Sequence, residues 1–157
     1  MIFQQLYEHC IKHRLTVSCA ESCTSGLISS KITTIAGSSA IFKGGIIAYQ
    51  NEIKIGLLSV PRKLIEEKTE VCFEVVEQMA RSIRKICLSD FSIATSGYSG
   101  PSGGTKVNPI GSIFIAISSN KRTISKRFIF EGDRDSIVNQ SVDSAVGFLL
   151  QELKNQQ

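Results

Sequence analysis

The sequence contains no tryptophan and only two histidines, and its hydrophobic residues form no long runs. No apolar stretch approaches the roughly 20 residues that a membrane-spanning helix needs, which argues against a membrane protein. Both histidines, His9 and His13, fall in one predicted helix, and this argues against a Ser-His-Asp triad. The net charge is only +4 and the basic residues are scattered. Nucleic acid is therefore not expected as a partner, and a small anionic ligand fits at least as well.

The five cysteines, an odd number, do not suggest a disulfide framework. Three of them lie in apolar periodic segments and are expected as reduced core thiols: Cys10, Cys72 and Cys87. Cys19 and Cys23 are close enough to share a metal, but no matching second pair of ligands exists. His9 and His13 are four residues apart, but the segment between them lacks the glutamate of the zinc-protease pattern. We therefore expect no metal site.

With 157 residues, the chain has the length of one domain, and we expect a single domain over residues 1–157. The N-terminus lacks the features of a signal peptide, so a cytoplasmic location is expected. Hydrophobic periodicity predicts helices and strands that alternate early, with a hairpin late, which indicates an α/β fold: a layered α/β/α domain with a mixed β-sheet. The predicted helices cover 2–13, the segment from Leu27, the segment from Asn51, 75–86 and 133–153, and the predicted strands cover 16–19, a bulged 41–49, 91–95, 113–117 and 123–130.

The segment from Thr16 to Gly26 places a cluster of hydroxyls between a short strand and an amphipathic helix. A serine nucleophile fits this place, because the first turn of a helix offers free N–H groups that stabilise an oxyanion or a phosphate. Ser22 is the candidate. The alternative is that Ser22 or Thr24 only caps the helix, which is the commoner use of hydroxyl residues at such positions.

Lys54 is the candidate base for Ser22, because lysine replaces histidine in this role when its pKa is lowered. It lies near the start of the helix that Asn51 is expected to cap, and the positive end of the helix dipole disfavours the ammonium form. The hydroxyl of Tyr49 could relay a proton or orient Lys54. The alternatives are an exposed helix lysine and an ordinary strand aromatic.

A loop with four glycines in ten residues, 96–105, is expected to approach a ligand closely. Gly132, Asp133 and Arg134 then begin the last helix, with Asp133 as its cap. Arg134 is a candidate partner for an anionic group of the ligand. The alternative for Arg134 is a surface ion pair at a helix start.

Together these segments resemble the CinA C-terminal domain family over nearly the whole chain. The resemblance rests on motifs in the family's order and spacing: Ala20–Gly26, Ala36–Ala40, Tyr49–Lys54, Gly97–Gly104 and Gly132–Arg134. It implies a nicotinamide-nucleotide amidohydrolase in its stand-alone form, a hydrolase that converts nicotinamide mononucleotide and water to nicotinate mononucleotide and ammonia. It also implies a homodimer, and no cofactor.

The family pattern implies that Ser22 is the nucleophile and Lys54 the base, with Tyr49 and Ser39 in support. Backbone N–H groups near Cys23 or in the glycine loop are expected to stabilise the oxyanion. The residues expected to bind the substrate are Cys23, Thr24, Ser39, Ser96, Gly97, Gly103, Gly104 and Arg134.

The chain departs from the family pattern in three places. Ser25 stands where a glycine is usual, and Ser96 where a threonine is common. Val138 and Asn139 stand where members often carry another arginine, and the loss of such a charge weakens phosphate binding by about ten- to a hundredfold. Two alternatives to the amidohydrolase therefore stay open: a catalytically weakened nucleotide-binding or competence-associated interaction module, and a hydrolase of other small amides or esters.

Overall fold

The computed structural model of the protein describes residues 1–156. Its strands form a five-stranded mixed sheet in the order β2-β1-β3-β4-β5, in which β1 runs parallel to β2 and β3, while β4 runs antiparallel to β3 and β5. The strands are β1 (Val17–Glu21), β2 (Phe42–Ile47), β3 (Phe91–Gly97), β4 (Ser112–Ser119) and β5 (Thr123–Ile129). The helices are α1 (Ile2–His13), α2 (Leu27–Thr33), α3 (Asn51–Leu58), α4 (Arg62–Lys68), α5 (Phe73–Cys87) and α6 (Arg134–Asn155), with a short 3₁₀ helix η1 (Ser38–Ala40).

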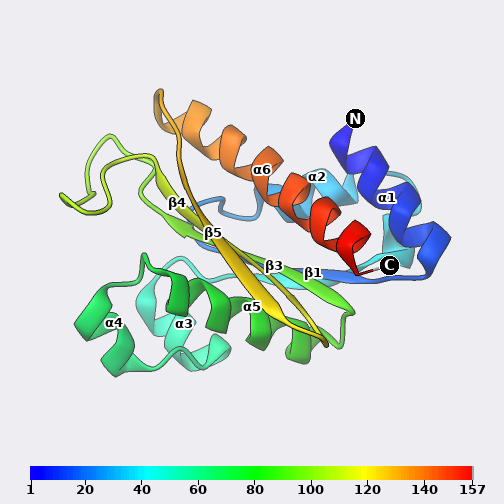
Figure 1. The fold of residues 1–157 in the computed structure, drawn as a ribbon, viewed down its shortest axis with the longest axis horizontal. Helices are drawn as coiled ribbons and strands as arrows, with labels where there is room; N and C mark the ends of the chain where they lie inside the picture. The colour runs from blue at the N-terminus through cyan, green and yellow to red at the C-terminus, as the bar shows by residue number, and fades with distance from the viewer. Residues whose placement is uncertain (157) are drawn as a thin grey trace.

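Helices cover both faces of the sheet (Figure 1). The helices α1, α2 and α6 pack on one face, and α3, α4 and α5 lie on the other. This arrangement confirms the predicted α/β/α layers and mixed sheet. No helix within residues 1–156 is both long enough and apolar enough to cross a membrane.

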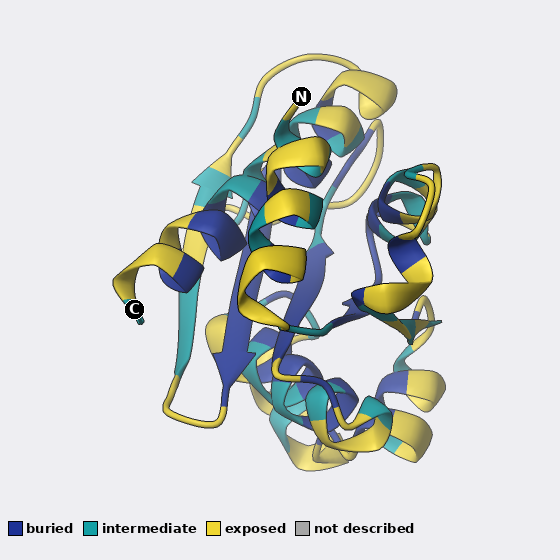
Figure 2. Ribbon diagram, turned by 90° about the vertical axis from the view of Figure 1, so that its right-hand side faces the viewer, coloured by how far each residue is buried: buried dark blue, intermediate teal, exposed yellow. Residues whose placement is uncertain are grey.

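The two faces of the sheet carry side chains of different size. Toward α1, α2 and α6 the central strands present bulky residues such as Ile93 and Ile115. Toward α5 they present small residues such as Ala94 and Ala116, with Phe114 of β4 as the bulky exception, packed against Phe73 at the start of this helix. The alternation follows from the two-residue period of a strand. Figure 2 shows the result, with buried central strands and exposed residues on the outer sides of the helices.

Two predicted details of the elements are confirmed. Asp133 caps α6, because its Oδ1 accepts a hydrogen bond of 2.8 Å from the N–H of Ser136. The bulge in β2 is present as well, because the pairing of β2 with β1 skips Lys43.

Other details differ from the prediction. Asn51 does not cap α3: it is the first helical residue, and Gln50 at the cap position makes no side-chain capping bond. The helix α4 was not predicted, because it has no fully buried residue and only Leu64 and Ile65 pack partly against the core, which is too few for an apolar stripe. The strand predicted over 41–49 ends at Ile47, so Tyr49 lies in the connection to α3. Two of the expected core thiols, Cys72 and Cys87, are only half-buried.

Candidate active site

The carboxyl ends of β1, β2 and β3 meet at one edge of the sheet. Beyond β1 the chain continues toward β2, whereas beyond β3 it continues toward β4, so the two connections diverge. In open α/β sheets such a point of divergence leaves a crevice in which ligands bind. Ser22 follows β1 directly and Gly97 ends β3, so both lie at this point.

Ser22 and Lys54 are in contact at this edge. Ser22 Oγ lies 3.1 Å from Lys54 Nζ, and the same nitrogen donates to the carbonyl oxygen of Tyr49 at 3.2 Å. The backbone N–H of Ser22 donates to the carbonyl of Thr95 at 3.1 Å, which ties the turn after β1 to β3. The candidate nucleophile and the candidate base are therefore held within hydrogen-bond distance by backbone contacts on both sides.

Lys54 is buried, with only 1 % of its surface exposed, so the alternative of an exposed helix lysine is wrong. Burial lowers the pKa of its side chain below the ordinary 10.5, because an ammonium loses its hydration inside the protein. Glu70, Cys23 and Glu52 act in the opposite direction. No salt bridge within residues 1–156 involves Lys54. Compared with an exposed lysine, the environment thus shifts Lys54 toward the neutral amine, the form that accepts a proton.

The carboxylate of Glu21 holds the turn that carries the nucleophile. It is buried and accepts five hydrogen bonds, from the N–H groups of Gly26, Ile28 and Ser29 and from the hydroxyls of Thr24 and Ser29. The cap position of α2 is Gly26, which has no side chain that could bond to the helix. The alternative that Ser22 or Thr24 caps this helix is therefore wrong, because Glu21 satisfies its free N–H groups.

Ser25 adopts a left-handed conformation with φ of 51° in the same turn. This conformation costs a residue with a side chain on the order of 1 kcal/mol and costs glycine almost nothing. Ser25→Gly is therefore expected to raise the free energy of unfolding by about 0.5 to 1 kcal/mol, measured by urea denaturation. The matched control is Ser30→Gly in α2, where glycine is expected to lower stability by a similar amount. A Ser25→Gly variant less stable than the native protein would contradict the expectation.

The residues at this edge enclose a pocket of about 190 Å³. Its lining contains seven of the residues predicted from the sequence: Ser22, Cys23, Tyr49, Lys54, Ser96, Gly97 and Arg134. It also contains residues that the sequence did not indicate individually: Glu70, Val71, Tyr98, Ser99, Gly100 and Ser102. The structure therefore brings together all three residues predicted to be catalytic.

Arg134 reaches the pocket from the start of α6. Its guanidinium donates to the carbonyl of Gly100 at 2.6 Å and to the hydroxyl of Tyr49 at 3.0 Å, so it is held by polar groups and not by a surface carboxylate. The hydroxyl of Tyr49 therefore pairs with Arg134, and Tyr49 contacts Lys54 through its backbone carbonyl. Val138 and Asn139 lie further along α6, outside the lining.

Four predicted site residues do not line the pocket. Thr24 is buried behind it, with its hydroxyl bonded to Glu21 and Thr95. Ser39 is exposed on η1, which precedes β2 and therefore lies at the opposite edge of the sheet. Gly103 and Gly104 line an open surface hollow further along the glycine loop.

The surroundings of two lining residues, Ser96 and Cys23, limit what their side chains do. The hydroxyl of Ser96 donates to the backbone carbonyl of Glu70 at 2.8 Å, so it fastens the α4–α5 loop to β3. Burial raises the pKa of the Cys23 thiol to about 12, so this thiol stays protonated at neutral pH and is no rival nucleophile.

Of the six lining residues that the sequence did not indicate individually, Glu70 and Ser99 bring polar side chains of most interest to the site. Glu70 lies in the loop between α4 and α5, and a glutamate in a charged loop carries no signal of a site. Ser99 belongs to the glycine loop, which was predicted to approach a ligand. Its hydroxyl is buried and has no hydrogen-bond partner within residues 1–156. A buried hydroxyl without a partner indicates a place where a ligand or water bonds.

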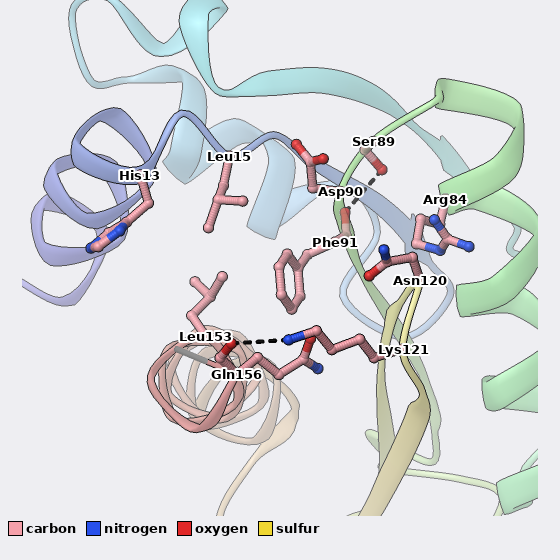
Figure 3. Close-up of a pocket in the computed structure, with 10 residues that line it drawn as sticks. All are labelled: His13, Leu15, Arg84, Ser89, Asp90, Phe91, Asn120, Lys121, Leu153 and Gln156. Carbon is pink, nitrogen blue, oxygen red and sulfur yellow. Dashed lines mark hydrogen bonds between the residues drawn. The ribbon is translucent and has the colours of Figure 1, made fainter.

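A larger hollow of about 400 Å³ lies at the opposite edge of the sheet (Figure 3). Leu15, Phe91 and Leu153 face one another across it, while the side chains of His13 and Arg84 point away from its centre. It brings no nucleophile next to a base. Within residues 1–156, no group of three or more histidine, cysteine or acidic side chains is placed to hold a metal ion.

The fold and the pocket define a class: an α/β domain with a mixed sheet and a serine–lysine pair at the carboxyl ends of its parallel strands. The model of the CinA C-terminal domain matches residues 2–153. The chain belongs to this family, as the resemblance predicted.

Known relatives agree with this assignment. A CinA-like protein of Fervidobacterium nodosum is 45 % identical over 136 residues, which are 87 % of this chain and 33 % of that protein. The chain thus spans about a third of the length of this relative. Among solved structures, the competence damage-inducible protein A of Klebsiella pneumoniae has a TM-score of 0.96 at 28 % identity, covering 99 % of this chain and 97 % of that one. A CinA superfamily protein of Enterobacter cloacae has a TM-score of 0.92 at 30 % identity, covering 97 % and 90 %.

Proposed function

We propose that the protein is a serine amidohydrolase that converts nicotinamide mononucleotide and water to nicotinate mononucleotide and ammonia. The observation that carries the proposal is the 3.1 Å contact between Ser22 Oγ and the buried Lys54 Nζ. A hydroxyl beside a lysine of lowered pKa is an activated nucleophile. The choice of substrate rests on the resemblance to the family.

The reaction divides into two steps. Neutral Lys54 accepts the proton of Ser22 as Oγ attacks the carboxamide carbon, and the ammonium then returns this proton to the departing nitrogen, which leaves as ammonia. A water molecule, deprotonated by Lys54, attacks the acyl ester, and the lysine returns that proton to Oγ as the C–O bond to Ser22 breaks. The acid released gives its remaining proton to solvent and leaves as the carboxylate. The carbonyl of Tyr49 keeps Nζ directed at Ser22 through both steps.

The oxyanion and the phosphate need separate partners. The N–H of Ser22 is already bonded to the carbonyl of Thr95, whereas the N–H groups of Cys23 and Thr24 donate to no backbone carbonyl within residues 1–156, and that of Cys23 contacts only its own thiol. These two groups are the proposed oxyanion donors. Arg134, held at the pocket by Gly100 and Tyr49, is the proposed partner of the substrate phosphate.

The test is an assay of the purified protein with nicotinamide mononucleotide, in which ammonia and nicotinate mononucleotide are both quantified. We expect the two products in equal amounts. Free nicotinamide and nicotinamide riboside serve as comparison substrates, and faster turnover of either one would redirect the proposal to other small amides.

The pH dependence of the reaction provides a separate prediction. The base form of Lys54 is required, and burial lowers the pKa of this group below 10.5 despite the opposing effect of Glu70, Cys23 and Glu52. Since the active fraction grows as Lys54 loses its proton, log(kcat/KM) is expected to rise with unit slope and to level off below pH 10.5. A profile that still rises beyond that pH would contradict a depressed pKa.

A second candidate function is a nucleotide-binding module without turnover. It is favoured by one observation: Arg134 is the single arginine among the residues that line the pocket. Stabilisation against heat by nicotinamide mononucleotide, without product, would support it. The homodimer stays a prediction, which sedimentation velocity tests directly.

A further inference from the structure

Glu70 carries a negative charge on the wall of the pocket. It lies in the loop between α4 and α5, is half-buried, and lines the pocket together with Ser22 and Lys54. Its backbone carbonyl accepts the Ser96 hydroxyl at 2.8 Å, which fixes the loop against β3. The backbone that carries this charge is therefore held at the pocket by a built contact.

The carboxylate of Glu70 has no partner of its own. Within residues 1–156 no salt bridge and no hydrogen bond reaches it. It is close enough to Lys54 to raise the pKa of that group, but Lys54 must be neutral to act as a base and then offers no balancing charge. A carboxylate without an ion-pair partner on the wall of a pocket attracts a cationic group of a ligand.

The two charged ends of the pocket come from opposite sides of the sheet. Glu70 belongs to the layer of α3, α4 and α5, whereas Arg134 begins α6 in the other layer (Figure 1). Arg134 suits an anionic group of a ligand and Glu70 suits a cationic one. A ligand with charges of both signs therefore fits the pocket better than one with a negative charge alone.

We propose that Glu70 is a specificity-determining residue that selects a carboxamide carried on a positively charged ring. This inference rests on the proposed amidohydrolase function and adds the charge of the ring as a requirement. The pyridinium of nicotinamide mononucleotide carries this charge next to the carboxamide, so the carboxylate contacts the ring while Ser22 attacks.

The test compares two ligands that differ only in ring charge. The first is nicotinamide mononucleotide, and the second is its neutral isostere, the 3-carbamoylphenyl C-nucleotide with the same ribose phosphate. Dissociation constants are measured by calorimetry in the background of Ser22→Ala, in which neither ligand is consumed. We expect the cationic ligand to bind at least about tenfold more tightly, and Glu70→Gln to remove about tenfold of this preference.

Glu52→Gln is the matched control. Glu52 also acts on Lys54 but is exposed at the start of α3 and does not line the pocket. We expect this variant to keep the preference for the cationic ligand. The neutral ligand serves as an internal check on folding. Its affinity is expected to change by less than about threefold in both variants, whereas the effect of Glu70→Gln on the preference is about tenfold, or about 1.4 kcal/mol.

The outcomes separate this inference from the proposed function. An unchanged preference in Glu70→Gln, an equal loss in Glu52→Gln, or no binding of either ligand would overturn the selection by Glu70. If the native protein releases no ammonia but Glu70→Gln still loses the preference, the inference stands and the proposed hydrolysis fails. If hydrolysis occurs without any preference between the ligands, hydrolysis stands and the inference fails.

Discussion

Ser22→Ala is expected to lower kcat/KM for the hydrolysis of nicotinamide mononucleotide by about 10⁴-fold or more. The Oγ atom is the candidate nucleophile and lies 3.1 Å from Lys54 Nζ, and alanine leaves no atom that forms an acyl ester. The fold is expected to stay unchanged, because the backbone N–H of residue 22 still bonds to Thr95. Ligand binding is expected to persist, since Arg134 and Glu70 stay in place.

The measurement is single-turnover release of ammonia, with thermal unfolding and calorimetric binding on the same sample. Ser30→Ala is the matched control, because Ser30 is an exposed serine of α2 outside the pocket lining. It is expected to keep full activity. If Ser22→Ala retains turnover within tenfold of the native protein, Ser22 has no role as nucleophile and water must attack the amide directly.

Lys54→Met is expected to lower kcat/KM by about 10³- to 10⁴-fold, because methionine fills the volume of the lysine stem but accepts no proton. The same change is expected to stabilise the fold at neutral pH by about 1 kcal/mol, because it removes a buried group whose charged form is disfavoured. Loss of activity together with a gain in stability distinguishes a catalytic role of Lys54 from a structural one. A variant that loses both would indicate that Lys54 chiefly holds the turn around Ser22.

The stability difference is expected to depend on pH. The pKa of Lys54 is lower in the folded protein than the 10.5 of the unfolded chain, so the unfolded state binds more protons between these two values. The native protein therefore gains stability as the pH rises through this window, and its deficit relative to Lys54→Met shrinks. Urea denaturation of both proteins at several pH values measures this change, and a constant difference would contradict the lowered pKa.

The sequence predicts the large elements because their apolar spacing is visible. The strands from Phe91 and Ser112 and the helix from Arg134 each bury a continuous set of side chains, and periodicity detects them. The helix α4 has no fully buried residue and so escapes the same reasoning. Local capping is less predictable, since Asn51 had a suitable side chain but α3 begins at that residue.

The candidate site, like the fold, was predicted only in part. Ser22 and Lys54 were found through a hydroxyl cluster and a helix start, and both lie in the pocket. Glu21 was overlooked, although its carboxylate accepts the hydrogen bonds of the first turn of α2 that we expected Ser22 or Thr24 to accept. The reason is that Glu21 lies at the end of β1 and not at the usual cap position directly before the helix. Glu70 was overlooked because its approach to Lys54 depends on how the α4–α5 loop is fastened to β3.

The candidate nucleophile and base come from a short stretch of chain, residues 22–54, which also supplies Cys23 and Tyr49. The remaining polar lining comes from three distant segments: the α4–α5 loop, the glycine loop and the start of α6. The residues of the proposed chemistry and most of the residues of the proposed ligand recognition therefore come from separate parts of the sequence. Exchange of the α4–α5 loop alone would alter the charge facing a ligand, and with it the pKa of Lys54, without replacing Ser22 or Lys54. The fold thus allows a protein engineer to exchange the loops of the proposed recognition site while the candidate serine–lysine pair stays in place.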